Sequence, residues 1–312
     1  MNYTLHQLQV FLKVAELKSI TKASEALHLS QPAVSIQLKN LQEQFEIPLI
    51  EVIGRQVYVT EFGREIAEAS QKIVEQVHAI NFKTMSYRDQ LVGHLNISIV
   101  STGKYVMPYF LSGFVNKHEG VELNMDVTNK LKVLDSLEQN HVDFALVSTI
   151  PSTFNVNKIE LMPNSLFWIG NCDKVFKNKT NNLTALKKLP FIFREHGSAT
   201  RHAMEAYMKS NDIKNTKRLE LTSNEAVKQA VIAGLGFSMM PIIGIRKELS
   251  DQDLQIIPMK GTPITTTWNL VWLKSKRLSP VAEAFVKYIS NSKTELINQH
   301  FSWYQDFLAD KN

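Results

Sequence analysis

The hydrophobic pattern of the chain changes at Gly93, and this change limits the possible folds more than any other feature. Before it, apolar residues recur three and four positions apart, as on one face of a helix. After it, short apolar runs alternate with helical segments, at residues 95–100, 105–117, 121–127, 131–139 and 142–148. Such alternation favours a mostly parallel sheet with helices on both faces. The predicted fold class is α/β, preceded by a mainly α segment.

The α/β part is long enough to form two lobes. Its later strands are expected at residues 166–170, 190–193, 219–221, 237–240 and 268–273, and its later helices at 199–210, 224–233 and 281–299. The pattern shifts near Pro163. We therefore expect one domain over residues 91–312, with lobe I at about 91–163 and 267–300 and lobe II at about 164–266.

Three short amphipathic helices are predicted before residue 46. The first follows Thr4, a plausible N-cap, and the second spans residues 21–28 with Thr21 as its cap. The third begins at Gln31-Pro32, since proline suits a first helical turn. Its inward stripe is Val34, Leu38, Leu41 and Phe45. Together with residues 55–60, which alternate like a short β-ribbon, these helices predict a winged helix-turn-helix over residues 1–60.

One long helix is predicted over residues 61–87, which contain no proline and no glycine after Gly63. Its heptad seam consists of Ile66, Ser70, Ile73, Val77, Ile80, Thr84 and Tyr87. A single helix with so narrow an apolar seam needs a partner, and the same helix of a second subunit is the simplest one. Residues 61–90 are thus predicted to be a linker helix that forms a homodimer.

The net charge of +5 suggests nucleic acid, but its distribution does not. Within residues 1–60 the cations Lys13, Lys18, Lys22, Lys39 and Arg55 are balanced by Glu16, Glu25, Glu43, Glu46 and Glu51. A DNA-binding role for the first 60 residues therefore has to rest on the pattern of residues.

The third helix carries polar residues suited to a major groove. Gln31 and Gln37 can pair with adenine, Ser35 can reach a base or a phosphate, and Lys39 a phosphate. The alternative is a three-helix unit whose polar residues are simply solvated, and periodicity does not decide between the two.

A second constellation follows the predicted strands, at the rim where open α/β sheets take ligands. Its polar residues are Ser101, Thr102, Thr128, Asn129, Ser148, Thr149, Ser198, Thr200, Ser223 and Asn224. Thr222 and Glu225 are spaced as a capping box for a helix. Helix N-termini and hydroxyls, joined by Arg201, can hold a small anion. The alternative is that each Ser, Thr or Asn caps its own helix.

Signals for other classes of protein are weak. Ser101-Thr-Gly-Lys104 lacks the companion motifs of acyl-transferring serine enzymes, and Gly234-Leu-Gly236 lacks the third glycine of a dinucleotide loop. The histidines form no tight metal pair, and Cys172 is the single cysteine. The start of the chain does not resemble a signal peptide, and the longest apolar stretch is too short to cross a bilayer. We expect no enzyme activity, no cofactor, no metal, no membrane association and a cytoplasmic location.

The tract 30–38, with Leu49, Arg55 and residues 60–63, resembles the DNA-binding signature of the LysR-type bacterial transcriptional regulators. The resemblance covers essentially the whole chain. It implies a winged helix-turn-helix, a dimerising linker helix, a two-lobed domain like a periplasmic binding protein, and usually a homotetramer. Tracts 100–105, 194–201 and 223–234 are similar to the branch that controls carbon-fixation operons and responds to anionic metabolites.

The resemblance implies promoter DNA and a small, anionic effector as partners. The DNA-binding residues are then Thr21, Ser30, Gln31, Pro32, Ala33, Ser35, Gln37, Lys39 and Arg55. Arg194 joins the rim residues and Arg201 as an effector-binding residue. The competing classes are an effector-independent DNA-binding protein of this type, an α/β enzyme and a solute-binding protein.

Three residues depart from the family pattern. Glu46 replaces a glycine at a turn, so that turn must avoid a left-handed conformation or tolerate its cost. Val52 stands where arginine is common before the wing, and Ile36 where a polar or basic residue often reaches DNA. Both changes predict weak affinity for each monomer, which binding by a dimer or tetramer would restore.

Overall fold

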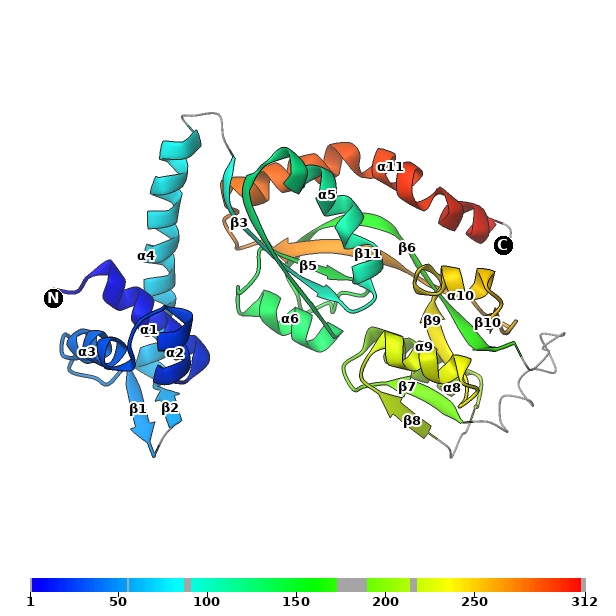
Figure 1. Cartoon of the computed structure of the whole chain (residues 1–312), viewed down its shortest axis with the longest axis horizontal. Helices are drawn as coiled ribbons and strands as arrows, with labels where there is room; N and C mark the ends of the chain where they lie inside the picture. The colour runs from blue at the N-terminus through cyan, green and yellow to red at the C-terminus, as the bar shows by residue number, and fades with distance from the viewer. Residues whose placement is uncertain (1, 55, 87–90, 173–189, 214–217, 310–312) are drawn as a thin grey trace. The chain divides into compact units, whose positions relative to one another are not determined.

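The computed structural model describes residues 2–54, 56–86, 91–172, 190–213 and 218–309. The chain forms two compact units, Met1–Asp89 and Gln90–Asn312 (Figure 1). No helix within the described residues is long and apolar enough to cross a membrane.

The first unit contains three helices, a hairpin and a long helix. They are α1 (Leu5–Leu17), α2 (Ile20–Ala26), α3 (Gln31–Gln42), β1 (Ile50–Ile53), β2 (Gln56–Val59) and α4 (Glu61–Ser86). Phe11, Val14 and Val34 are fully buried in the core between the helices. Thr4 caps α1 through a capping box with Gln7, as its sequence position predicts.

The predicted cap of α2 is wrong. Ser19 is the N-cap, and its hydroxyl accepts a hydrogen bond from the Lys22 amide at 3.3 Å. Thr21 lies exposed in the first turn of the helix. Serine and threonine are both good caps, so the choice between Ser19 and Thr21 depended on backbone conformation, which is extended at Ser19.

Thr60 and Gly63 join α4 to the core of this unit. The Thr60 hydroxyl donates to the Pro48 carbonyl at 2.6 Å and accepts from the Gly63 amide at 2.9 Å. A Cβ on Gly63 would lie 1.9 Å from the carbonyl oxygen of Leu49. Only glycine lets the first turn of α4 approach the chain so closely.

The second unit is built on one mixed sheet of seven strands in the order β10-β6-β11-β5-β3-β4, with β9 also paired to β6. Its strands are β3 (Val92–Val100), β4 (Gly120–Thr128), β5 (Phe144–Val147), β6 (Val156–Asn171), β9 (Ser238–Pro241), β10 (Leu254–Ile256) and β11 (Ile264–Leu273). Only the pairs of β3 with β4 and β5 are parallel. The expectation of a mostly parallel sheet is therefore wrong, because an apolar run shows that a strand is buried but not which way it runs.

Strands β6 and β11 run through both lobes. They pair antiparallel from Val156 beside Leu273 to Leu166 beside Ile264. The β5 strand flanks β11 in lobe I, whereas β9 and β10 pair with the later part of β6 in lobe II. The predicted strand 166–170 is thus the end of a much longer one, and two continuous strands connect the lobes.

Helices cover both faces of the sheet in lobe I. In Figure 1, α5 (Met107–Lys117) and α11 (Pro280–Ala309) lie on one face and α6 (Lys130–Glu138) on the other. Helix α5 begins two residues later than predicted because Gly103–Tyr105 form a short 3₁₀ turn, η1.

Helix α11 is longer than predicted and is kinked at Phe301. Beyond the kink, the Tyr304 hydroxyl accepts from the Ser165 amide at 2.9 Å and donates to the Pro163 carbonyl at 3.0 Å. The end of α11 is therefore attached to β6 where that strand crosses between the lobes.

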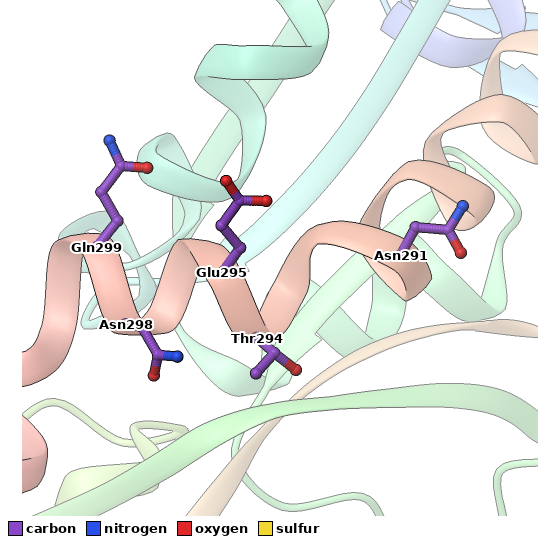
Figure 2. A pocket seen from close by; sticks show the side chains of 5 residues that line it. All are labelled: Asn291, Thr294, Glu295, Asn298 and Gln299. Carbon is purple, nitrogen blue, oxygen red and sulfur yellow. The ribbon is translucent and has the colours of Figure 1, made fainter.

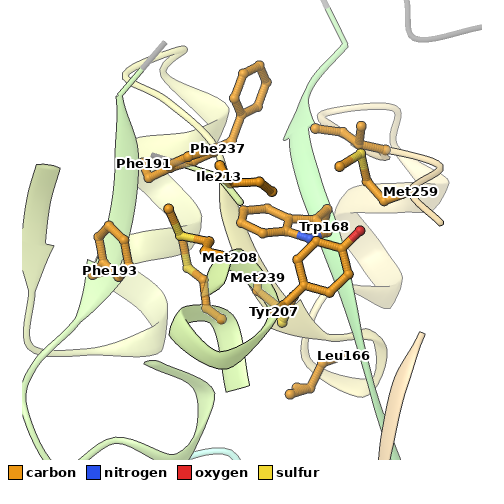
Figure 3. Packing of buried hydrophobic residues seen from close by; sticks show 12 residues of the cluster. Leu166, Trp168, Phe191, Phe193, Tyr207, Met208, Ile213, Phe237, Met239 and Met259 are labelled. Carbon is orange, nitrogen blue, oxygen red and sulfur yellow. The ribbon is translucent and has the colours of Figure 1, made fainter. Parts of the chain in front are cut away.

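Lobe II has its own aromatic core. The lobe contains a small parallel sheet of β7 (Phe191–Arg194) and β8 (Arg218–Leu221), together with helices α8 (Ala199–Ser210) and α9 (Asn224–Ile232). The indole of Trp168 lies in the middle of the cluster, 5.3 Å from the ring of Phe191 and 5.7 Å from that of Tyr207 (Figure 3). Short segments complete the lobe: η2 (Ile242–Gly244) and α10 (Arg246–Ser250).

Candidate DNA-binding and ligand-binding sites

Helix α3 separates a buried face from an exposed one. Val34, Leu38 and Leu41 face the core, as the spacing predicted. Of the predicted DNA-binding residues, Thr21, Ser30, Gln31, Pro32 and Lys39 are exposed, and Ala33, Ser35 and Gln37 are half-buried. Arg55 lies outside the described residues.

Some polar side chains at α3 already have a hydrogen-bond or ion-pair partner within the protein. Ser30 is the N-cap, and its hydroxyl accepts from the Ala33 amide at 3.4 Å. Lys39 lies 3.7 Å from Glu43, with both side chains exposed. Such an exposed pair is weak, so Lys39 can exchange this carboxylate for a phosphate.

The three departures from the family pattern have visible consequences. Glu46 is not among the described residues with positive φ, so its turn avoids the left-handed conformation. Ile36 is 56% exposed and Val52 is 57% exposed. Each presents an apolar side chain on the surface of the helix-turn-helix unit.

Arg194, at the end of β7, is the most buried cation among the predicted ligand-binding residues, with 3% of its surface exposed. Its Nε and Nη2 donate to the two carboxylate oxygens of Glu195 at 2.8 and 2.9 Å. Its Nη1 donates to Asn224 in lobe II and to Ser101 in lobe I, the latter at 3.1 Å. Arg194 therefore connects the lobes, and its charge is balanced by Glu195.

Ser101 receives two of the hydrogen bonds between the lobes. Besides that of Arg194, its oxygen accepts from Asn224 Nδ2 at 3.3 Å. A serine hydroxyl can also donate its own proton. Ser101 is thus positioned between the lobes with a donor left for a ligand, at the rim where the sequence predicted one.

Several rim residues cap their own helices. Asn129, Ser198 and Ser223 are the N-caps of α6, α8 and α9, and each side chain accepts from the amide three residues later. The capping box predicted for Thr222 and Glu225 is wrong, because α9 starts one residue later than that spacing assumed. These residues do cap their own helices, as the alternative interpretation predicted.

Arg201 does not present a free charge. Its Nε donates to Glu205 at 3.0 Å, and its Nη1 donates to Glu220 at 2.7 Å and to the carbonyl of Arg194 at 3.1 Å. It therefore holds the end of β7 in place and is poorly suited to bind an anion directly.

The remaining rim residues differ in burial. Thr102, Ser148 and Thr200 are buried, Thr128 is half-buried and Thr149 is exposed. Thr149 accepts a hydrogen bond from Lys130 Nζ at 2.7 Å. The sequence prediction included Thr149 but missed Lys130, although a lysine that directly follows the strand-end pair Thr128-Asn129 is a visible signal.

A second contact between the lobes involves Tyr105 and Lys228. The Tyr105 ring packs where a Cβ on Gly244 would lie, 2.6 Å from its Cε2 atom. Lys228, 8% exposed, lies 2.6 Å from Glu248 and 3.0 Å from Glu225. Burial lowers the pKa of Lys228, but its hydrogen bonds to Glu248 and Glu225 outweigh this, so the pKa is raised. This contact borders a surface depression of about 460 Å³.

A larger depression of about 830 Å³ lies along α11. It is lined by Asn291, Thr294, Glu295, Asn298 and Gln299. These side chains leave the helix in different directions (Figure 2), so the feature is a polar helix surface, and it contains none of the predicted site residues. Among the described residues, no cluster of His, Cys, Asp and Glu could hold a metal ion.

Two family models match the chain. Residues 5–64 match the bacterial regulatory helix-turn-helix protein, lysR family, and residues 88–293 match the LysR substrate binding domain. The HTH-type transcriptional activator CmpR of Synechocystis is 34% identical over 92% of this chain and 95% of its own length. A RuBisCO operon transcriptional regulator of Allochromatium vinosum is 36% identical over 93% of this chain and 96% of its own.

Solved structures agree with these matches. The regulatory domain of CcmR from Synechocystis, in complex with 2-PG, is 32% identical, with a TM-score of 0.60 over 64% of this chain and 97% of its own. CbnR in complex with its target DNA has a TM-score of 0.63 over 93% of this chain and 99% of its own, but at 19% identity it supports the fold alone. Two family models that together match most of the chain, and relatives similar over nearly its full length, lead to one conclusion. The chain belongs to the LysR family of bacterial transcriptional regulators.

Proposed function

We propose that this LysR-type regulator is controlled by a small anionic metabolite that binds where Ser101 of lobe I meets Arg194 and Asn224 of lobe II. The buried hydrogen bonds between these three residues carry the proposal. A ligand that changes them changes how the lobes contact each other, and it can act as an effector because its affinity then differs between the two arrangements.

The ligand class is supported by a relative. The CcmR domain, 32% identical to this chain, binds 2-PG, which we take as 2-phosphoglycolate, a small phosphorylated acid. We propose a ligand of the same chemistry here, a short carboxylate or phosphate. The relatives are named as regulators, and we infer that this chain has no catalytic activity of its own.

Titration of 2-phosphoglycolate into the full-length protein tests the ligand site. Isothermal calorimetry of the wild type should give saturable binding, and Thr102→Ala should weaken it because Thr102 is buried beside Ser101. Thr222→Ala is the matched control, since Thr222 is exposed on the same rim and caps no helix. Absence of binding to the wild type by 2-phosphoglycolate and by inorganic phosphate would reject an anionic ligand.

The DNA-binding domain is assigned to residues 1–60. We propose that Gln31, Ser35 and Gln37 of α3 lie in the major groove, with Lys39 on a phosphate and Arg55 reaching the backbone or the minor groove from the hairpin β1–β2. The exposure of Gln31 and Lys39, and the partial exposure of Ser35 and Gln37 beside the buried stripe of α3, support this assignment.

A gel-shift titration with a duplex selected from a random-sequence library tests this interface. The double variant Gln31→Ala with Gln37→Ala should lose about tenfold or more in affinity, since each glutamine pair with adenine contributes about 1–3 kcal/mol. The control is Gln76→Ala, an exposed position on α4 outside the heptad seam. Equal affinity of the double variant and the wild type would exclude α3 as the reading helix.

Residues 61–90 are proposed as the dimerisation segment. Ser70 is buried, whereas Ile73, one step further along the seam, is 43% exposed. Ile73→Glu should therefore shift the protein toward monomers in sedimentation velocity. Lys72→Glu, an adjacent exposed position, controls for the added charge.

A further inference from the structure

Lys130 occupies an unusual position at the contact between the lobes. It is the first residue of α6, directly after the cap Asn129, and its Nζ donates to Thr149 Oγ1 at 2.7 Å. This bond joins the segment that follows β4 to the segment that follows β5. Lys130 is half-buried, and burial lowers the pKa of its ammonium group.

Lys130 differs from most other buried or half-buried cations around this contact. Lys104 is also half-buried and has no carboxylate at ion-pair distance among the described residues, but its Nζ lies over the Tyr105 ring, 5.0 Å from the ring centre. Arg194 is paired with Glu195, Arg201 with Glu205 and Glu220, and Lys228 with Glu225 and Glu248. Within the described part of the chain, no carboxylate lies within ion-pair distance of Lys130. A cation that has lost part of its hydration without gaining a counter-ion is unfavourable, so this position suits an anion supplied from outside.

The segment around Lys130 faces lobe II. The Leu131 amide donates to the Gly197 carbonyl at 3.3 Å, and a Cβ on Gly197 would lie 3.4 Å from Asn129 Oδ1. Gly197 lies three residues after Arg194 along the chain. Lys130 therefore borders the same loop that leads from the bridging arginine, and it does so from the opposite lobe.

We propose that Lys130 is the residue that recognises the charge of the ligand, and that it makes the site prefer a phosphorylated acid over the same acid without its phosphate. This inference rests on the proposed function of the site. Arg194 and Arg201 are already paired with carboxylates: Arg194 joins the lobes, and Arg201 holds the end of β7. The charge offered to the ligand therefore comes from Lys130. A lysine recognises phosphate as a compact point charge with up to three donors.

Calorimetric titration of the full-length protein with 2-phosphoglycolate and with glycolate tests the proposal. Lys130→Met should weaken binding of 2-phosphoglycolate about tenfold or more, whereas Lys130→Arg should stay within about threefold of the wild type, because it keeps the charge. Lys132→Met, an exposed position on the same helix, is the matched control and should bind like the wild type. The preference for 2-phosphoglycolate over glycolate should disappear in Lys130→Met alone.

The pH dependence provides a readout that a merely structural role would not change. As pH rises through the lowered pKa of Lys130, the wild type should lose affinity, since the ammonium group becomes neutral. Lys130→Arg should keep its affinity across the same range, because arginine remains charged.

The two possible failures are distinct. If neither 2-phosphoglycolate nor phosphate binds to the wild type, the proposed function fails and this inference with it. If the wild type binds 2-phosphoglycolate and Lys130→Met binds it equally well, the site stands and Lys130 is not its charge-recognising residue. Urea unfolding should show that Lys130→Met is as stable as the wild type. If that variant does not fold, the pH dependence of 2-phosphoglycolate affinity in the wild type and in Lys130→Arg decides the question. Parallel pH dependence in these two proteins would overturn the inference.

Discussion

Arg194 in lobe II donates a hydrogen bond to the Ser101 hydroxyl in lobe I at 3.1 Å, and this bond is the shortest link between the lobes at the predicted ligand site. Its guanidinium is held on the other side by Glu195, so the geometry of the link is set from within lobe II. The contact that we propose responds to the ligand is therefore fixed on the Arg194 side by a carboxylate of the same lobe.

Removing the hydroxyl in Ser101→Ala should leave Arg194 and Asn224 each without one partner. A buried donor that loses its acceptor costs about 1–3 kcal/mol. Urea unfolding should show a loss of that order, and the response to 2-phosphoglycolate in DNase footprinting should shrink. Thr222→Ala, at an exposed rim position that caps no helix, is the control for stability. An undiminished footprint response in Ser101→Ala would remove this bond from the regulatory mechanism.

Tyr304→Phe tests the attachment of α11 to the crossing strand. The hydroxyl is buried, with 1% of the residue exposed, and it serves two backbone groups of β6. Both would be left unsatisfied, so we expect a loss of about 1–3 kcal/mol in urea unfolding. Burial raises the pKa of Tyr304, so the contribution is present below the tyrosine's usual pKa and is lost as pH rises through the folded-state value. Tyr109→Phe, an exposed tyrosine on α5, should change stability little.

Gly63→Ala should damage the helix-turn-helix unit selectively. The added methyl group would meet the Leu49 carbonyl at 1.9 Å, and backbone cannot yield as a flexible side chain can. We expect a loss of at least about 1–3 kcal/mol, the usual cost of overpacking, together with weaker DNA binding. Thermal melting should show this loss, whereas Glu65→Ala, exposed two residues further along α4, should melt like the wild type.

Lys228→Met should remove a pH-dependent contribution to stability from the ion pairs of Lys228 with Glu225 and Glu248. Two carboxylates would remain without their cation; breaking the largely buried pair with Glu248 costs about 3–5 kcal/mol at most, and the exposed pair with Glu225 adds less because solvent screens it. The pKa of Glu225 is lowered chiefly by its hydrogen bond to Lys228, so its contribution is present above its unfolded-state pKa and is lost as pH falls through the folded-state value. The difference in stability between variant and wild type should therefore be large at pH 7 and should narrow in acid. A gap that is constant from pH 7 to pH 3 would contradict this assignment.

Ile36→Ala tests whether the departure on α3 reads DNA. An exposed apolar side chain on the face opposite the core can contact the methyl group of thymine. Wild-type affinity should fall when one thymine of the selected duplex is replaced by deoxyuridine, and Ile36→Ala should be insensitive to that replacement. If the wild type binds every duplex with a single thymine-to-deoxyuridine replacement as tightly as the original duplex, Ile36 does not contact a thymine methyl group.

Periodicity was sufficient for much of this fold. Helix α3 and its buried stripe follow from the spacing of Val34, Leu38 and Leu41, because residues four and three positions apart share one face only in a helix. Helix α8 matches its predicted bounds, Ala199–Ser210, with Ser198 as its cap. Three of the rim residues, Asn129, Ser198 and Ser223, cap the helices that follow them, which was one of the two interpretations the sequence allowed.

Local pattern could not determine strand direction or length. Strand β6 continues from Val156 to Asn171, and its antiparallel partners come from residues about 70 to 120 positions later in the chain. Those pairings depend on where the chain returns. The extension of α11 beyond Phe301 likewise depends on the packing of Tyr304 against β6.

The sequence by itself determined the family, the helix-turn-helix and the set of polar residues from which a ligand site can be built. Only the tertiary structure decided which charges in that set are available. The sequence indicates Arg194 and Arg201 as anion-binding residues, yet Glu195, Glu205 and Glu220 pair with them, while Lys130, which is not in that set, has no carboxylate partner among the described residues. The reason is physical: a residue's charge follows from its identity, but whether that charge is free depends on which groups the fold brings within a few ångströms of it.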